Sequence, residues 1–438
     1  MEISELYHIF QQHPVVTTDS RDCPDGSLFF ALKGTSFDGN KFAALALEKG
    51  CAYAVVDEAE YAIDGDPRYI LVDDTLATLK HLARHHRRTL GTPIIGITGT
   101  NGKTTTKELT AAVLMQKYRV LYTEGNFNNE IGVPKTLLRL RPEHEIAVVE
   151  MGASHPGDIK SLVDVVEPDY ALITNVGRAH LQGFGSFEGV VRTKGELYDF
   201  MRAHSRRVFI DSGNNHLMRI AHDLDLIRYA VSDDAHLDVN GRIVDCAPML
   251  HFQWRNNCEG RAGEWHDVST HLIGAYNVAN MLAAVTIGTR FGVDAHLIDE
   301  ALSAYIPSNN RSQFEQTATN RLIVDAYNAN PTSMAAALDN FAEIDDPHKM
   351  CIIGDMKELG AVSHDEHQRI VNRLAAMSLE QVWLVGSEFE GCDTPSSFRL
   401  FDNVDAVKTA LAEDKPTGMY ILVKGSNGTK LFQLPPLL

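Results

Sequence analysis

Residues 96–105 read Gly-Ile-Thr-Gly-Thr-Asn-Gly-Lys-Thr-Thr and carry the clearest chemical signal in the chain. An apolar, strand-like segment precedes this stretch, and a helix-forming segment follows it. A strand, a glycine-rich loop and a helix that opens on Lys-Thr together aim backbone N–H groups at a polyphosphate. Gly99 and Gly102 would let the backbone approach the phosphates, Lys103 would reach the terminal ones, and the Thr104 hydroxyl would lie on Mg²⁺. The pattern predicts binding of a nucleoside triphosphate with Mg²⁺.

The loop departs from the usual P-loop at one position. A glycine is expected five residues before Gly102, and Ile97 stands there. The alternative is a glycine-rich turn that binds nothing. Because Gly-Lys-Thr follows a strand and opens a helix, we favour the phosphate-binding interpretation.

Two further polar residues follow strand-like segments. Glu150 ends the apolar run 146–149, and His180 follows the run 171–174. Ligands of open α/β sheets bind outside the carboxyl ends of the strands, so Glu150 is placed to hold Mg²⁺ directly or through water. The alternatives are an acid in a loop and a structural histidine.

Lys194 stands on an apolar stripe. Its neighbours at helical spacing are Phe187, Val190, Val191, Leu197, Tyr198 and Met201. An inward-facing lysine loses hydration and its pKa falls. The neutral amine could then react with CO₂ to form a carbamate, a ligand for a second Mg²⁺ beside His180. Spacing alone favours the alternative that Lys194 reaches outward or pairs with an acid.

Three polar groups come later in the chain. Asn277 and Asn280 begin a helical segment, where their amides suit either purine recognition or helix capping, and the sequence does not decide between these two roles. Residues 325–333 form a polar cluster between a strand and a helix, which is either a ligand-binding edge or turn and cap chemistry. Arg311 lies in the preceding linker and could reach a phosphate across a cleft.

The elements that must position these groups fall into three regions of an α/β protein. Residues 1–88 mix strands with helices and predict a small α/β domain; the basic run 84–88 is expected to be the exposed end of a helix. Residues 89–305 alternate apolar strands and helices, which predicts a parallel sheet covered on both faces; 236–273 read as an antiparallel excursion. Residues 306–438 repeat the alternation and predict a second doubly wound, Rossmann-like domain.

Composition limits the class of protein. The 438 residues are 44% hydrophobic and 22% charged, with a net charge of −18, which argues against a nucleic-acid or anionic-membrane binder. The six cysteines are widely spaced, which favours reduced thiols in the cytoplasm. We expect no signal peptide and no membrane insertion.

Taken together, these segments resemble the Mur ligases, the ATP-dependent enzymes that form amide bonds in bacterial peptidoglycan synthesis. The resemblance covers essentially the whole chain. It is carried by Thr-Gly-Thr-Asn-Gly-Lys-Thr-Thr at 98–105, Gly-Asn-Phe-Asn-Asn-Glu-Ile-Gly-Val-Pro at 125–134, Glu-Met-Gly-Ala at 150–153, Asn-Val-Gly-Arg-Ala-His-Leu at 175–181, Asp-Ala-Tyr-Asn-Ala-Asn-Pro at 325–331, Gly-Asp-Met-Lys-Glu-Leu-Gly at 354–360, Thr-Asp-Ser-Arg at 18–21 and Ala-Leu-Lys-Gly at 31–34.

The resemblance implies roles for individual residues. Lys103, Glu150, His180 and carbamylated Lys194 are implied to be catalytic, with Thr104, Glu150, His180 and Lys194 as Mg²⁺ ligands. The implied ATP-binding residues are Gly99, Thr100, Asn101, Gly102, Lys103, Thr104, Thr105, Asn277, Asn280, Arg311, Asp325, Tyr327 and Asn328. The implied substrate-binding residues are Ser20 and Arg21, at the UDP end, with Asn126, Asn128 and Asn129. Tyr276 departs from the family, which commonly has His there, and this puts the contact with the nucleotide base in question.

The implied activity is the ATP-dependent joining of D-Ala-D-Ala to UDP-N-acetylmuramoyl-tripeptide through an acyl phosphate, by a cytoplasmic monomer. Residues 1–88 would bind the UDP substrate and 89–305 would bind ATP. The alternatives are another amino-acid ligase of this family, a ligase like folylpolyglutamate synthase, or a P-loop switch or transport ATPase. The folate enzyme resembles only the later two regions, and an ATPase would turn over nucleotide without an amine acceptor.

Overall fold

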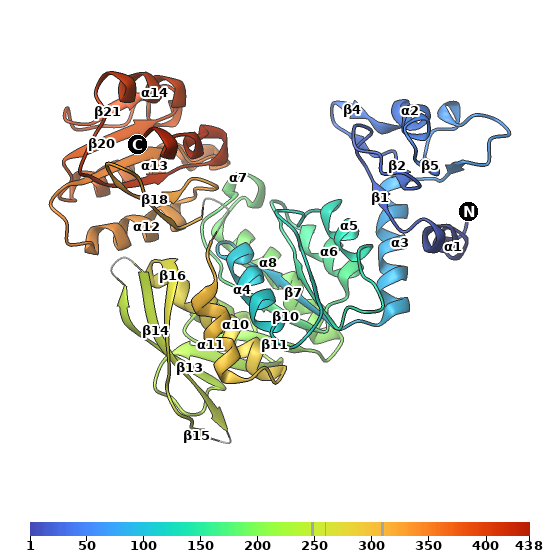
Figure 1. Ribbon diagram of the computed structural model, residues 1–438, viewed down its shortest axis with the longest axis horizontal. Helices are drawn as coiled ribbons and strands as arrows, with labels where there is room; N and C mark the ends of the chain where they lie inside the picture. The colour runs from blue at the N-terminus through green and yellow to red at the C-terminus, as the bar shows by residue number, and fades with distance from the viewer. Residues whose placement is uncertain (247–248, 259, 308–310) are drawn as a thin grey trace.

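The computed structural model describes the 438-residue chain apart from residues 247–248, 259 and 308–310. Three groups of elements follow one another along the chain, and each is built around its own main sheet (Figure 1). This arrangement confirms the predicted α/β fold in three parts. Within the described ranges, no helix is long and apolar enough to cross a membrane.

The N-terminal domain is built on a four-stranded parallel sheet in the order β1-β2-β5-β6. The central strand β2 is wholly buried, as its Leu-Phe-Phe sequence requires. The elements are α1 (Ile3–Gln12), β1 (Val16–Thr17), β2 (Leu28–Phe30), β3 (Lys33–Gly34), β4 (Phe37–Asp38), η1 (Gly39–Phe42), α2 (Ala43–Glu48), β5 (Tyr53–Val56), η2 (Ala59–Tyr61), β6 (Tyr69–Leu71) and α3 (Thr75–Leu90).

Helix α3 joins this domain to the rest of the molecule (Figure 1). The Asp74 side chain caps its first turn by accepting the N–H of Ala77, and Gly91 ends it in the left-handed conformation. The expectation that its basic end is solvent-exposed is wrong for Arg87, which is 7% exposed. Its guanidinium donates to the Glu167 carbonyl at 3.0 Å and to the Asp169 carboxylate at 3.1 Å, so ion pairing with the central domain buries it.

The central domain has a ten-stranded sheet whose main path is β15-β14-β13-β12-β11-β10-β7-β9-β8. From β8 to β13 neighbouring strands are parallel, as predicted. The elements are β7 (Ile94–Thr98), α4 (Lys103–Leu114), β8 (Val120–Tyr122), α5 (Gly132–Leu137), β9 (Ile146–Glu150), α6 (Asp158–Val166), β10 (Tyr170–Ile173), α7 (Leu181–Phe184), α8 (Phe187–Ala203), β11 (Arg207–Asp211), α9 (Asn215–Ile220), β12 (Asp225–Val231), β13 (Val239–Cys246), β14 (Met249–Cys258), β15 (Arg261–Ala262), β16 (His266–Ile273), η3 (Ala275–Asn277), α10 (Val278–Arg290) and α11 (Ala295–Ala304).

Alternate residues of the central strands pack on opposite faces. Ile94 of β7 belongs to the core that also contains α3, α6 and α8, whereas Ile95 and Ile97 belong to the core beneath α4 and α10. A sheet buried on both faces gives the near-continuous apolar strands that the sequence shows.

The expected antiparallel excursion is confirmed: β14 pairs antiparallel with β13 and with β16. The excursion is also continuous with the main sheet, because β13 pairs parallel with β12. Strand β12 has no continuous apolar run to mark it in the sequence, because its exposed and buried residues are mixed. The helical segment expected to begin at Asn277 starts as an α-helix at Val278, after a 3₁₀ turn.

The C-terminal domain has a six-stranded sheet in the order β17-β18-β22-β19-β20-β21, with only β17 antiparallel. Helices cover both faces, so it is a doubly wound domain, as predicted. The elements are β17 (Gln313–Gln316), β18 (Arg321–Asp325), α12 (Pro331–Glu343), β19 (Lys349–Gly354), η4 (Gly360–Val362), α13 (Ser363–Ala375), β20 (Gln381–Val385), η5 (Ser387–Phe389), β21 (Arg399–Phe401), α14 (Val404–Glu413), β22 (Tyr420–Lys424), η6 (Asn427–Thr429), η7 (Leu431–Gln433) and η8 (Pro435–Leu437).

Candidate functional site

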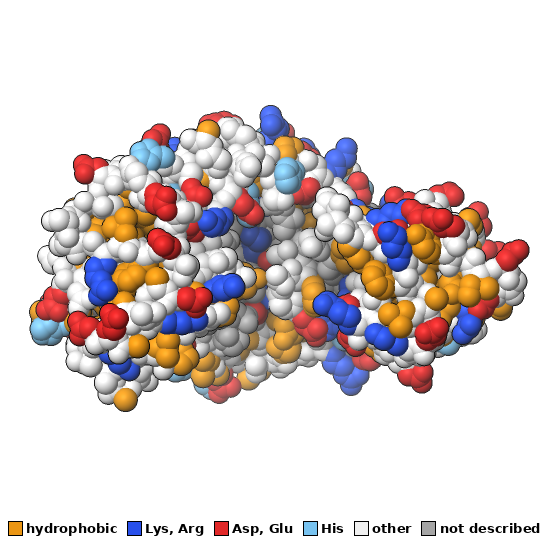
Figure 2. Space-filling model, turned by 90° about the horizontal axis from the view of Figure 1, so that it is seen from above, with side chains coloured by type: hydrophobic (Ala, Val, Ile, Leu, Met, Phe, Trp, Pro, Cys, Tyr) orange, Lys and Arg blue, Asp and Glu red, His pale blue; other side chains and the backbone are white. Residues whose placement is uncertain are grey.

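A cleft of about 820 Å³ lies at the carboxyl ends of the central strands, facing the C-terminal domain. Seen from above, the molecule is hollowed between the C-terminal domain at the left and the N-terminal domain at the right, and a basic side chain is visible in the floor (Figure 2). The cleft has two sides. We call the side formed by residues 100–105, Glu150 and His180 the central wall, and the side formed by Arg311 and residues 325–333 the C-terminal wall.

The loop between β7 and α4 belongs to the central wall, and two of its glycines lie where a side chain would be crowded. Gly99 has φ +146°, and a Cβ there would lie 2.0 Å from the Thr174 hydroxyl. Gly102 has φ +76°, and a Cβ there would lie 2.6 Å from the Asn280 side-chain oxygen. A side chain at either position would be strained by the positive φ, and either the loop or the neighbouring Thr174 or Asn280 side chain would have to shift.

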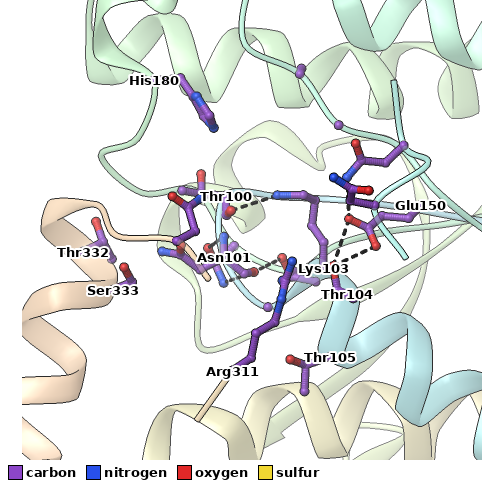
Figure 3. Close-up of a pocket in the computed structure, with 18 of the residues that line it drawn as sticks. Thr100, Asn101, Lys103, Thr104, Thr105, Glu150, His180, Arg311, Thr332 and Ser333 are labelled. Atoms are coloured by element: carbon purple, nitrogen blue, oxygen red, sulfur yellow. Dashed lines mark hydrogen bonds between the residues drawn. The ribbon is translucent and has the colours of Figure 1, made fainter. Parts of the chain in front are cut away.

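Lys103 folds back over this loop. Its ammonium donates to the carbonyls of Gly99 and Thr100, both at 2.9 Å (Figure 3). Burial lowers the pKa of the Lys103 ammonium, the nearby Glu150 carboxylate opposes that shift, and Arg311 adds to it. A cation is therefore held beside the N-terminus of α4, where the helix dipole also favours an anion.

Glu150 is fully buried at the end of β9. Its carboxylate accepts the Thr104 hydroxyl at 3.0 and 3.2 Å and the Asn128 amide at 2.7 Å, and its backbone N–H donates to the Thr123 hydroxyl at 3.0 Å. A carboxylate and a hydroxyl side by side are hard oxygen donors of the kind that Mg²⁺ prefers. The pair could hold a magnesium ion, and that role stays a prediction.

The Lys194 side chain lies on the buried face of α8 rather than on its solvent-exposed face. The side chain is 2% exposed, and its ammonium lies 5.5 Å from the Phe184 ring centroid and 3.5 Å from the Ala153 carbonyl. Burial lowers the pKa of Lys194 well below its ordinary value, and the nearby Lys103 lowers it further. The alternative that Lys194 reaches outward is therefore wrong. The cleft is lined by His180 but not by Lys194.

His180 sits on the loop after β10 and points toward the P-loop (Figure 3). Its Nδ1 is hydrogen bonded to the Glu358 carboxylate of the C-terminal domain. Burial lowers the pKa of the imidazole; the Glu358 carboxylate raises it, and the ammoniums of Lys103 and Lys194 lower it. The net shift is downward, which favours the neutral ring at neutral pH.

Asn277 and Asn280 line the cleft beside the P-loop. The Asn277 amide donates to the Ile273 carbonyl at 2.7 Å and the Asn280 amide donates to the Asn277 side-chain oxygen at 2.8 Å; Thr106 donates to Asn280 at 3.0 Å. Helix capping by the Asn277 side chain is not observed, because α10 begins without a side-chain cap. This leaves an ordered amide pair at the edge of the cleft.

The C-terminal wall carries the other predicted nucleotide residues. The Arg311 guanidinium lies 3.9 Å from the Tyr327 ring centroid, and its buried Nε has no hydrogen-bond partner among the described residues. Asp325 pairs with Lys424 at 2.5 Å, and Lys424 also donates to the Asn328 carbonyl at 3.3 Å. All five residues line the cleft.

The predicted substrate residues divide into two groups. Asn126, Asn128 and Asn129 line the cleft, whereas Ser20 and Arg21 lie in the N-terminal domain and do not. The Arg21 side chain is 88% exposed and pairs with Asp19 at 2.7 Å. The structure thus brings the asparagines to the same cleft as the P-loop and leaves Ser20 and Arg21 apart from it.

Two contacts across the domain boundary were not predicted from the sequence. Asn330 caps α12 and donates its amide to the Asn101 side chain at 2.7 Å, and Glu358 contacts His180. Both stand in segments that carry the family resemblance, at 325–331 and 354–360, but nothing in those segments marks a contact between domains. Tyr276 also lines the cleft, where its hydroxyl is 2.7 Å from that of Ser312.

Three family models match the chain in order. They are described as the Mur ligase family catalytic domain at residues 14–87, the Mur ligase middle domain at 97–288, and the Mur ligase glutamate ligase domain at 310–427. The UDP-N-acetylmuramoyl-tripeptide–D-alanyl-D-alanine ligase of Bacillus subtilis strain 168 is 34% identical over 433 residues, 96% of this chain and 92% of that protein.

Solved structures give the same result. A MurF crystal structure from Acinetobacter baumannii is 31% identical, with a TM-score of 0.84 over 96% of this chain and 92% of that one. The MurF ligase of Thermotoga maritima in complex with ADP is 24% identical, with a TM-score of 0.84 over 97% of this chain and 96% of that one, and shows a shared fold.

Proposed function

This chain belongs to the Mur ligase family, and we propose that it joins D-alanyl-D-alanine to a UDP-N-acetylmuramoyl-tripeptide at the expense of ATP, a step of peptidoglycan synthesis. The observation that carries the proposal is the 34% identity over 96% of the chain to a ligase named for this reaction. The cleft supports it, because a P-loop, a buried acid and a second domain face one another there.

The peptide carboxylate must be activated before the amide bond can form, since a carboxylate is a poor acceptor for an amine. In the proposed reaction the peptide carboxylate oxygen attacks the γ-phosphorus of ATP, and ADP leaves with formation of an acyl phosphate. The dipeptide amine then attacks the acyl carbon, phosphate departs, and the amine nitrogen loses a proton. Two anions must meet in the first step, so the protein acts mainly by positioning and charge neutralisation.

The residues of the central wall would bind the phosphates. Loop N–H groups and the Lys103 ammonium would neutralise the terminal phosphate, and Arg311 would reach the triphosphate from the opposite wall. Asn277 and Asn280 would contact the adenine side. Asp325, Tyr327 and Asn328 would complete the nucleotide site, while Ser20 and Arg21 would hold the UDP end in the N-terminal domain.

Magnesium fits the oxygen donors described above. Thr104 and Glu150 would hold one ion, and His180 with carbamylated Lys194 would hold a second. When bound, the Mg²⁺ ions would neutralise the negative charge of the phosphates. Lys194 is suited to the carbamate because its lowered pKa increases the neutral amine, which adds to CO₂ with loss of one proton. The monomeric state and the cytoplasmic location stay predictions.

The test is acceptor-dependent turnover. Purified protein, ATP and Mg²⁺ are incubated with D-Ala-D-Ala and a UDP-linked tripeptide whose third residue is lysine or diaminopimelate. We expect ADP, phosphate and a nucleotide peptide heavier by one dipeptide, all dependent on both substrates. Formation of AMP and pyrophosphate, or hydrolysis that is indifferent to the dipeptide, would contradict the proposal.

A further inference from the structure

The loop after β19, residues 355–359, reaches from the C-terminal domain to His180. The Glu358 carboxylate is hydrogen bonded to His180 Nδ1, and the Glu358 carbonyl accepts the Gln182 N–H at 3.1 Å. At this contact both His180 (φ 50°) and Glu358 (φ 63°) adopt the left-handed backbone conformation. Residues other than glycine hold that conformation where the surrounding structure fixes it, and such positions cluster at functional sites.

The loop is anchored in its own domain on both sides of Glu358. The Met356 N–H donates to His367 Nε2 at 2.9 Å, and the Lys357 N–H donates to the Ser426 hydroxyl at 3.2 Å. The Leu359 side chain is buried in the C-terminal core. The carboxylate of Glu358 is therefore presented by a fixed segment rather than by a free loop.

The His180 ring is held in one orientation. The Phe184 ring packs edge-on against it, with centroids 6.2 Å apart and planes at 83°. Within the described part of the chain, the bond to Glu358 is the ring's only hydrogen bond. A carboxylate can only accept, so Nδ1 must carry the hydrogen, and in the neutral ring the lone pair lies on Nε2.

We propose that Glu358 is a positioning residue that fixes His180 in the Nδ1–H tautomer and presents the Nε2 lone pair to the cleft. The C-terminal domain thereby completes a ligand of the central wall. That Nε2 binds the second Mg²⁺ rests on the proposed function, whereas the tautomer of His180 does not depend on it. Partners of this kind orient metal-binding histidines, and their loss costs about 10–100-fold in metal affinity or activity.

The first experiment reads the tautomer without substrates or metal. In full-length protein labelled with ¹⁵N-histidine, the His180 nitrogens are assigned by their loss in His180→Gln, at an alkaline pH where the ring is neutral. We expect a protonated Nδ1 and an unprotonated Nε2 in the wild type. In Glu358→Ala we expect averaged nitrogen shifts from mixed tautomers, and in Glu358→Gln, which keeps an acceptor oxygen, partial return to the wild-type pattern.

The second experiment measures the Mg²⁺ dependence of ligation, with a matched control across the same boundary. Arg178 pairs with Glu366 at 2.9 Å, so Glu366→Gln weakens a contact between the same two domains without touching His180. We expect Glu358→Ala to raise the half-saturating Mg²⁺ concentration about tenfold or more, with a smaller fall in kcat at saturating Mg²⁺. Glu366→Gln should leave the Mg²⁺ dependence and the His180 nitrogens unchanged.

The outcomes separate this inference from the proposed function. Unchanged nitrogen shifts in Glu358→Ala, or equal changes in Glu366→Gln, would overturn the positioning role, whatever the enzyme catalyses. If the shifts change as expected while the protein ligates nothing, the positioning role stands and the proposed function fails.

Discussion

The two walls of the cleft hold their polar side chains in different ways. On the central wall, Lys103, Thr104 and Glu150 are fixed by partners in their own domain, and those partners are backbone groups or buried side chains. On the C-terminal wall, Asn330 and the neighbouring loop residue Glu358 find their partners across the domain boundary. These three residues are therefore held within one domain, whereas the contacts of Asn330 with Asn101 and of Glu358 with His180 depend on how the two domains are placed.

The difference indicates that the two walls of such a site have separate tasks. Groups that neutralise charge in the reaction need fixed positions, which a sheet buried on both faces supplies. Groups that admit and release nucleotide can come from a second domain. Substitutions on the central wall should therefore lower kcat, whereas substitutions on the C-terminal wall should raise KM for ATP.

The largest effect is expected from Lys103→Met, which keeps the length of the side chain and removes its charge. Ligation should fall about 10³-fold or more, because the terminal phosphate and the peptide carboxylate would meet without the cation. Phosphate release with both substrates measures the rate, and thermal unfolding close to that of the wild type shows that the fold is intact. Near-normal turnover would refute the assignment of Lys103.

Lys194→Ala comes next, with an expected loss of about 100-fold. Since the carbamate is a carboxylate, added acetate should restore part of the activity to Lys194→Ala and none to Lys103→Met. In the wild type, activity should fall when CO₂ is removed from the buffer and return with bicarbonate. Absence of rescue at saturating acetate, with no response to CO₂, would count against a carbamate at this position.

Arg311→Lys tests the opposite wall with a smaller expected effect. The charge remains but the planar contact with Tyr327 is lost, so KM for ATP should rise about fivefold while kcat changes little. Tyr327→Ala should give a similar rise, and the double variant should be no worse than either single one. Fully additive losses would show that the two side chains act separately.

Asn330 should give the smallest effect, and two substitutions separate its roles. Asn330→Ala removes the cap of α12 and should lower stability by about 1 kcal/mol in denaturant unfolding. Asn330→Asp keeps the cap but loses the N–H that reaches Asn101, so stability should stay and KM for ATP should rise a few-fold. A fall in kcat with unchanged KM would contradict the division between the walls.

The sequence predicted the parts of the site whose geometry is local. The P-loop and the acid that ends β9 follow from residue spacing, because a strand and the turn after it are set by neighbours in the chain. The spacing alone favoured an outward or acid-paired Lys194 rather than the buried one, since an amphipathic stripe does not say how deeply one of its positions is buried. The contacts of Asn330 and Glu358 were missed, because each joins residues more than 170 positions apart in the chain.

The fold, too, could be predicted from the sequence only where its pattern is local. The apolar runs at 146–149 and 171–174 marked β9 and β10, which are buried almost throughout, whereas β12, with mixed exposure, has no such run. The burial of Arg87 depends on Glu167 and Asp169, which are 80 and 82 residues away, so no local pattern could reveal it. Pairings over such distances are decided by tertiary packing rather than by propensity.

Helix α3 gives the molecule a built-in spacer. It begins at a cap in the N-terminal domain and its other end is locked to the central domain through Arg87, so its 16 residues form a rod of roughly 24 Å. Because Glu167 and Asp169 directly precede β10, the locked end lies at the amino ends of the central strands, on the side away from the cleft. The rod therefore fixes how far the N-terminal sheet stands from the central domain, although α3 itself does not line the cleft.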